Sequence, residues 1–414
     1  MNTEIHHGFF WIPNPSNSDK PNKVFGTIRR DGKDGSSVIT LYHPEVNEKE
    51  FYNYVNHNVI WGEIENGYNI SLFDTYMIGD IHHETYTSYT VEYVITGRHL
   101  YSLNEDAYSE CKIKFDNLNN WIKKFDVEQE YNAGKFSFVI DEENCKEPKL
   151  VIPLNDETTL SICTSVVRQT QAFNINISQY AYLKINTQKN KSINYFIEII
   201  TEFSQFLSFV LQSPQYPQEI TFDSVLLFNI KESKKSRYPL LPFDMFKDKL
   251  PFIYANWHNK FSNLAPICRY YFNTLSNGDF DVPDFITIAQ AIDGYHKRFV
   301  NKKDGKDIRQ YPHELQKLLD IFDGVEVIKM CNIDKDVFAE LRHKYVHLYP
   351  DEEFKIKLSI NDLYILTQKG IVLLTCCFFH SLGLDNQEIN KCCRRNGLYH
   401  RVRTMLWNYK KEVI

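Results

Sequence analysis

The residues best suited to chemistry lie in a short segment of helical spacing, where Arg342 is followed five positions later by His347. A histidine with a pKa near neutrality can take a proton from a ribose 2′-hydroxyl or give one to a departing 5′-oxygen. An arginine stays charged and can bind a phosphate through two hydrogen bonds. Together the two side chains have the chemistry for RNA cleavage without a metal, which leaves a 2′,3′-cyclic phosphate and a 5′-hydroxyl.

Helix geometry places a condition on this pair. Five residues on a regular helix turn the chain by about 500°, so the two side chains point roughly 140° apart. A shared site therefore requires a distortion of the helix near His347, or a second subunit that supplies a matching pair. Without either, the pattern describes a surface arginine and a histidine at the end of a helix, and an Arg-x4-His spacing is common by chance.

The elements that must position this pair follow two different patterns along the 414 residues. In the first half, β-branched and aromatic residues alternate with polar ones, and turn pairs such as Asp34-Gly35 and Asn66-Gly67 separate the runs. This alternation predicts an antiparallel sandwich or a barrel. The clearest predicted strands are 37–42, 68–73, 86–95, 135–140, 158–167 and 181–185.

Helical spacing begins near residue 192 and returns after residue 250. Apolar residues from Ile193 to Val210 recur every three to four positions, and a polar, basic stretch at 231–242 predicts a linker. We predict further helices at 252–276, 283–300, 312–330, 334–348, 359–382 and 386–411.

The predicted fold is therefore an α+β multidomain protein with two parts. A β-rich domain, sandwich-like or barrel-like, covers 1–245, and an all-α bundle covers 246–414. The helix near 192–212 is compatible with either part.

Charge divides along nearly the same line. Residues 1–249 hold 24 Lys and Arg against 33 Asp and Glu, whereas residues 250–414 hold 23 against 20. The window 391–411 has seven basic residues, no acidic one, and interleaved aromatic residues at Tyr399, Trp407 and Tyr409. Such a stripe can follow a phosphate backbone while its rings stack on bases. The alternative is a solvated helix face.

Other features restrict the class of protein. The sequence contains no Walker loop, GxGxxG, HExxH or GxSxG, so it offers no usual support for the enzymes that carry these motifs. The N-terminus has no signal-peptide pattern, and the longest apolar stretch, at 370–379, is too short to span a bilayer. We therefore expect a cytoplasmic protein with free thiols and no membrane partner.

Two groups of residues have side chains that can bind a metal. A cysteine and histidine set near the C-terminal end could form a tetrahedral zinc site, but its spacing fits no zinc-finger pattern, so we expect core packing, no metal and no other cofactor. The histidines at 6–7 and the run 82–84 lack partners at a recognisable spacing, and we expect surface positions for them. The members of the first set are Cys376, Cys377, His380, Cys392, Cys393 and His400.

The run 341–347 resembles the Arg-x4-6-His motif of HEPN ribonucleases. In that superfamily the residue after the arginine is usually small and polar or a histidine, as His343 is. The segment 282–298 resembles the upstream helix of the ApeA-like HEPN family, which carries an acidic residue followed by Tyr-His and a base. Here Asp293 takes the acidic position, and Tyr295, His296 and Arg298 follow it.

The N-terminal half carries the same resemblance. The segments 7–13, 25–28 and 60–74 are similar to the opening of the ApeA N-terminal domain. The resemblance implies an antiphage, abortive-infection ribonuclease with a sensor or regulatory domain at 1–245. A phage-encoded trigger protein would release the activity against RNA, with tRNA a leading candidate. It also implies a homodimer through the HEPN domain, with the two motifs meeting at the interface.

The resemblance also assigns roles to single residues. Arg342 would bind the scissile phosphate, His347 would act as acid or base, His343 would assist, and Asp293 would orient Arg342. We expect RNA to contact Lys344 and four arginines of the basic window, which are Arg394, Arg395, Arg401 and Arg403. The alternative function is a catalytically silent HEPN fold used for dimerisation or for binding.

Overall fold

A computed structural model of the chain describes residues 4–13, 22–31, 36–42, 56–78, 86–122, 127–132, 135–140, 147–171, 174–222, 225–227, 239–276, 281–301, 310–350 and 359–412. Contacts within the chain divide it into two compact units. The first unit comprises 1–204 and 215–234, and the second comprises 205–214 and 235–414.

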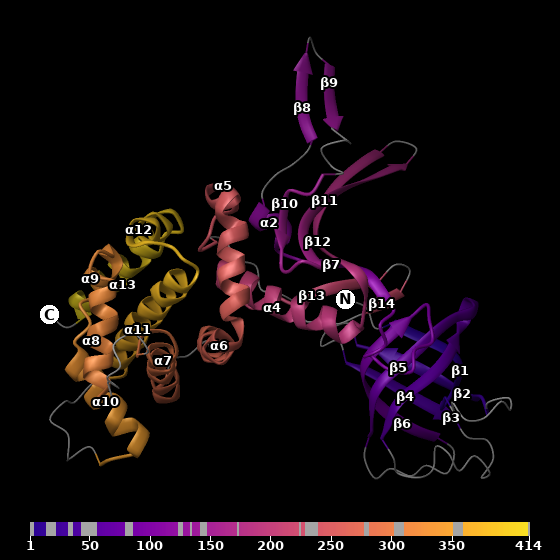
Figure 1. Ribbon diagram of the computed structural model, residues 1–414, viewed down its shortest axis with the longest axis horizontal. Coiled ribbons are helices and arrows are strands. Elements are labelled where there is room, and N and C mark those ends of the chain that lie inside the picture. Colours follow the sequence, from indigo (N-terminus) through magenta and orange to yellow (C-terminus); the bar gives the residue numbers. More distant parts are fainter. Residues whose placement is uncertain are drawn as a thin grey trace. The chain divides into compact units, whose positions relative to one another are not determined.

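Six strands of the first unit close into an antiparallel barrel (Figure 1). Their order around the wall is β6-β3-β2-β1-β4-β5, and β5 pairs back with β6, so no strand edge stays open. The strands are β1 (Glu4–Trp11), β2 (Val24–Arg30), β3 (Ser37–Tyr42), β4 (His57–Ile64), β5 (Tyr68–Met77) and β6 (Tyr86–Thr96).

The barrel interior is filled by alternate side chains of these strands. A Cβ atom at Gly62 would lie 2.4 Å from Cδ1 of Phe10, so the inward position opposite this ring must lack a side chain. The buried residues that fill the barrel are Phe10, Val24, Ile28, Ile39, Leu41, Ile60, Ile64, Ile70, Leu72, Tyr89, Val91 and Val94.

A second group of strands continues the sheet from the barrel through the β14–β6 pairing. Their order is β10 (Leu150–Pro153), β11 (Thr158–Gln171), β12 (Asn174–Lys191), β7 (Tyr108–Phe115), β13 (Pro217–Phe222) and β14 (Val225–Leu227). The short helix α2 (Leu118–Ile122) follows β7, and β8 (Val127–Asn132) and β9 (Lys135–Ile140) form a separate hairpin.

Helix α4 (Ile193–Leu211) packs on this sheet through its first part. The ring of Phe196 lies 5.4 Å from that of Phe222, and Phe203 lies 5.7 Å from Phe115. The last residues of α4 belong to the second unit, where Phe206 packs 5.6 Å from Trp257. Helix α4, whose sequence is compatible with either part, is therefore divided between the two units.

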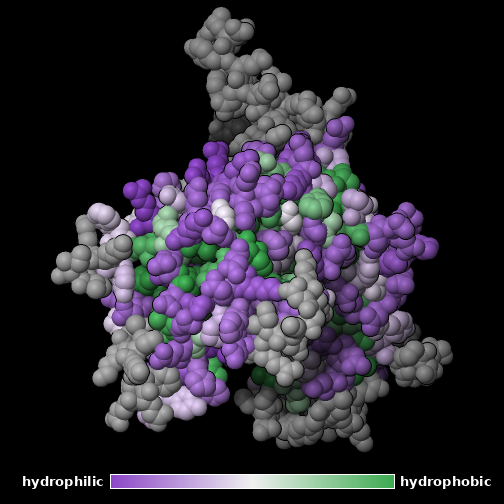
Figure 2. Space-filling view, turned by 60° about the vertical axis from the view of Figure 1, so that its left-hand side comes forward, coloured by the Kyte–Doolittle hydropathy of each residue, from purple (hydrophilic) through white to green (hydrophobic). Residues whose placement is uncertain are grey.

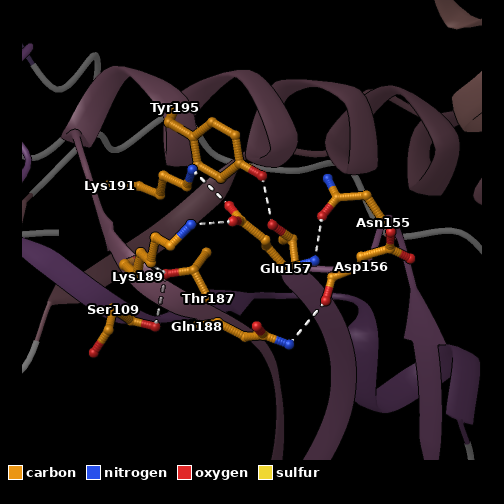
Figure 3. A network of polar contacts seen from close by, with 10 residues as sticks. Ser109, Asn155, Asp156, Glu157, Thr187, Gln188, Lys189, Lys191 and Tyr195 are labelled. Carbon is orange, nitrogen blue, oxygen red and sulfur yellow. Dashed lines mark hydrogen bonds and ion pairs between the residues drawn. The ribbon is translucent and has the colours of Figure 1, made fainter.

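A polar network fastens the beginning of α4 to the turn between β10 and β11 (Figure 3). The carboxylate of Glu157 accepts hydrogen bonds from Lys189 at 2.7 Å and Lys191 at 3.0 Å. The hydroxyls of Tyr195 and Thr158 lie 2.6 Å apart.

The second unit is helical around a buried central helix, α11 (Ile360–Ser381). By length and composition α11 could cross a membrane, but 78% of its most apolar window is buried inside the protein, as in the core helix of a bundle. The other α-helices described in this unit are α5 (Phe243–Phe246), α6 (Leu250–Ser276), α7 (Val282–Tyr295), α8 (Tyr311–Ile321), α9 (Glu326–Cys331), α10 (Lys335–His347), α12 (Asn386–Arg395) and α13 (Leu398–Glu412).

The predicted α+β class is confirmed, with a barrel and an attached open sheet in place of a single sandwich or barrel. In the structure, two of the predicted helices are each interrupted and form a pair of shorter helices. The segment 312–330 breaks after Ile321, where Asn386 and Asn390 donate to the main-chain oxygens of Ile321 and Gly324. The segment 386–411 breaks before Leu398, because Gly397 adopts a φ of +76° that a helix cannot contain.

Most apolar side chains of both units are buried, so polar residues make up most of the surface. The face in Figure 2 is mainly hydrophilic, with hydrophobic residues visible in smaller patches between hydrophilic ones. Most of the linker predicted at 231–242 lies outside the described residues, which resume at 239.

Candidate functional site

Arg342 is bound by a carboxylate from another helix. Its Nη2 donates to Oδ2 of Asp293 over 2.9 Å, from α10 to α7. Lys297, one turn beyond Asp293, forms a second ion pair with it at 2.8 Å. The side chain of Asp293 is 12% exposed and that of Arg342 27%. One carboxylate thus holds the arginine side chain in a partly buried position. The role of Asp293 in orienting Arg342 for phosphate binding stays a prediction.

Two buried residues of helix α8, Tyr311 and Glu314, complete this cluster. The guanidinium of Arg342 lies 4.5 Å from the centre of the buried Tyr311 ring, whose hydroxyl donates to the main-chain oxygen of Ala289 at 3.1 Å. Glu314 is also buried, and burial together with a hydrogen bond to Asp293 raises its pKa to about 7. Of the two carboxyl groups in this cluster, Asp293 is bound directly to the arginine, and Glu314 is hydrogen-bonded to Asp293.

His296 lies at the end of α7 and is fully buried. Burial lowers the pKa of its imidazole, which favours the neutral ring. Neither ring nitrogen has a hydrogen-bond partner among the described residues. The turn at 296–300 is a π-helix, and such turns often occur at functional sites.

The histidines of α10 form a separate, exposed group of rings. The rings of His343 and His347 lie 4.7 Å apart, and that of Tyr349 lies 5.1 Å from the first and 5.8 Å from the second. Leu348 ends the helix in the left-handed conformation, with φ of +54°, and thereby turns Tyr349 back toward both histidines. All three rings are exposed to solvent.

Helix α10 is regular up to His347, so the distortion that would unite the pair within one chain is absent. Arg342 faces α7 and α8, whereas His347 belongs to the exposed ring group. Of the two conditions for a shared site, only the second subunit remains.

The five residues expected to contact RNA differ in their surroundings. Lys344 is 7% exposed, with its ammonium over the ring of Tyr345, so its position does not support a phosphate contact. Arg394 forms an ion pair with Glu326 at 2.5 Å, and Arg401 donates to the side chain of Gln212 at 2.9 Å and to the main chain. Arg395 and Arg403 are exposed and have no ion pair within the described part of the chain.

The cysteines lie inside the helical unit rather than around an open site. Cys376, Cys377, Cys392 and Cys393 are all free and buried. A hydrogen bond with Cys393 and burial raise the pKa of the Cys376 thiol far above its usual value. Across the residues that the structure describes, no group of three or more His, Cys, Asp or Glu is placed to bind a metal. The run 82–84 lies outside those residues, and His7 lies 3.1 Å from the Thr27 hydroxyl.

Sequence reasoning identified Arg342, His343, His347 and Asp293 but missed three neighbours. Tyr311 and Glu314 stand three apart on α8, where an aromatic and an acid next to the apolar stripe were the available signal. Tyr349 comes two residues after His347, outside the expected helix.

Comparison with known families assigns the chain to a class of protein. The helical region from 286 to 388, which contains Asp293, Arg342 and His347, matches the model of the Apea-like HEPN domain. The chain is therefore similar to a family of HEPN-domain nucleases. Residues 5–257 match the model of ApeA N-terminal domain 1, which alone covers more than half of the chain. The chain therefore belongs to the ApeA family of antiphage HEPN proteins. No curated protein and no solved structure matches it.

Proposed function

We propose that the helical unit is a metal-independent endoribonuclease that is released during phage infection. The observation that carries this proposal is the pairing of a carboxylate-bound Arg342 with an exposed His347 on one helix of a HEPN domain. The arginine has a fixed orientation, and the histidine is open to a substrate. These are the properties that positioned phosphate binding and proton transfer require.

The cleavage follows from the chemistry of these groups. His347 takes the proton of a ribose 2′-hydroxyl, the resulting oxygen attacks the adjacent phosphorus, and a second histidine protonates the departing 5′-oxygen. Arg342 stabilises the charge that develops on the phosphate oxygens. His343, 4.7 Å from His347, is the nearest candidate for an assisting group in the same chain.

A homodimer through the helical unit completes the site in this proposal. Since Arg342 and His347 leave a regular helix in different directions, two copies of α10 must approach each other to bring both residue types into one cleft. Exposed apolar side chains near the end of α10 and the start of α11 favour such a contact. They are Val346, Leu348, Ile360 and Tyr364.

The test uses the purified full-length chain and total tRNA as the probe. We expect slow basal cleavage in the presence of a chelator, with 2′,3′-cyclic phosphate ends, and loss of this cleavage in His347→Ala. His313→Ala, which removes another exposed histidine of the same unit, is the matched control and should cleave like the wild type.

Two results would contradict the proposal. One is cleavage that survives in both His347→Ala and Arg342→Ala. The other is an Arg342→Ala/His347→Ala double variant that protects cells from phage as well as the wild type does, which would favour a catalytically silent HEPN module.

A further inference from the structure

The outer wall of the barrel carries a row of aromatic side chains across four neighbouring strands, of which the first three are exposed and the fourth, Tyr86, is half-buried. Phe9 on β1, Phe25 on β2 and Tyr42 on β3 are 51%, 46% and 42% exposed, and Tyr86 on β6 continues the row. Neighbouring ring centres along this aromatic row are 5.8, 6.1 and 6.5 Å apart. Outward positions of a barrel in water are usually polar, so the row requires an explanation.

Strand register, and not chance proximity, builds this aromatic row. Phe9 pairs directly with Phe25, and Tyr42 pairs directly with Tyr86. On the outward positions next to it, His7 lies 3.1 Å from the hydroxyl of Thr27, and the hydroxyls of Thr40 and Ser88 lie 3.0 Å apart.

The aromatic row is therefore a pre-formed apolar surface. Its rings support one another across the strands, and its polar neighbours already have hydrogen-bond partners. A partner that covers it would leave few buried polar groups unpaired and would order few side chains, and both effects lower the cost of binding.

The net negative charge of residues 1–96 indicates what kind of partner would bind the aromatic row. Residues 1–96, which include the whole barrel, contain 13 Asp and Glu against 6 Lys and Arg. Lys23, beside the row, forms an ion pair with Glu63, with 2.8 Å between its Nζ and Oε2 of Glu63, and its ammonium lies over the ring of Trp11. A nucleic acid would be repelled by this excess of negative charge, whereas a basic protein would be attracted to it.

We propose that the aromatic row is the docking surface for a basic protein with an exposed apolar patch, which becomes available during infection. This inference rests on the proposed function, because it supplies the site at which the signal for release is received. Aromatic side chains in the centre and complementary charge around them are the usual composition of such interfaces.

Site-specific photocrosslinking tests the surface directly. Photoreactive p-benzoylphenylalanine replaces Tyr42 in one strain and Tyr76 in the control, because Tyr76 is equally an exposed barrel tyrosine, 51% exposed, on β5 and outside the row. Both chains carry His347→Ala, so that the result does not depend on nuclease activity. We expect a light-dependent adduct between position 42 and one basic, phage-encoded protein in infected cells only.

Several outcomes would overturn the inference. They are no adduct from position 42, an equally strong adduct from position 76, an adduct with RNA, and an adduct with a host protein that also forms without infection. A failed nuclease assay with a specific adduct at position 42 would reject the proposed function and leave the docking surface intact.

A second variant checks the consequence in cells that carry the active enzyme. Phe25→Ser/Tyr42→Ser should abolish protection against phage while the purified chain keeps its basal RNA cleavage, and Tyr68→Ala/Tyr76→Ala should protect normally. Protection by the first double variant equal to that of the wild type would show that the row does not receive the signal.

Discussion

Asp293 and Glu157 each bind two cations, and the surroundings of these two carboxylates differ. Asp293 binds Arg342 and Lys297 with a side chain that is 12% exposed, above a floor formed by Tyr311 and Glu314. Glu157 binds Lys189 and Lys191 with a side chain that is 34% exposed, and Lys189 itself is 75% exposed.

The comparison shows how burial decides what an ion pair does. Near the surface, water screens both charges, and an ion pair adds little to stability. In a partly buried cluster, removal of one member leaves the others without compensation and costs much more. The Glu157 network therefore adds little to the stability of the fold, whereas the Asp293 cluster keeps the arginine of the candidate site in one orientation.

The largest effect is expected for Asp293→Ala. The variant leaves Arg342 and Lys297 next to each other without their carboxylate, so we expect the free energy of unfolding to fall by about 3 kcal/mol. Urea denaturation of the full-length chain measures this change. A loss no larger than that of the Glu157 variant below would remove the distinction between the two carboxylates.

The second prediction uses the titration of Glu314. Its pKa is raised from 4.5 to about 7 in the folded chain, so the folded state binds the proton more tightly than the unfolded state does. Its contribution to stability is therefore complete below about pH 4.5 and decreases as the pH rises toward about 7. We expect a loss on the order of 2 kcal/mol over this window in the wild type.

Glu314→Gln keeps the size of the side chain and removes the titration. Denaturant unfolding at several pH values should show a flatter profile for this variant than for the wild type over the same window. Parallel profiles would mean that Glu314 does not titrate there.

A smaller change is expected for Arg342→Lys. The lysine keeps the positive charge beside Asp293 but loses the planar contact with Tyr311, so unfolding should cost about 1 kcal/mol less than in the wild type. The rate of RNA cleavage should fall strongly although the fold is only slightly destabilised, because an ammonium cannot bind a phosphate in the bidentate manner of a guanidinium. Equal cleavage rates for Arg342→Lys and the wild type would show that Arg342 does not bind the phosphate through its guanidinium.

The smallest effect is expected for Glu157→Gln. Hydrogen bonds from Lys189 and Lys191 lower the pKa of Glu157, so any contribution to stability is present above its ordinary pKa and is lost on acidification. Because the cluster is exposed, we expect no resolvable change in the free energy of unfolding, measured by urea denaturation at physiological salt. A shift comparable to that of Asp293→Ala would contradict the assigned importance of burial.

Some of the fold and of the site could be predicted from the sequence. The alternation at 37–42 and the three-to-four spacing of Ile193 to Val210 predicted β3 and α4 with small errors, because periodicity records which side chains face the core. The breaks before Glu326 and Leu398 could not be predicted from apolar spacing, because side chains of another helix and one left-handed glycine create them.

The sequence by itself determined the β-rich and helical halves, their opposite charge balance and the residue types that can transfer a proton and bind a phosphate. Only the tertiary structure decided their surroundings. It joined Arg342 to Asp293 across 49 residues, added Glu314 to the cluster, buried Lys344 and exposed His347. The physical reason is that periodicity describes one element at a time, whereas burial and charge pairing depend on which other element covers each face.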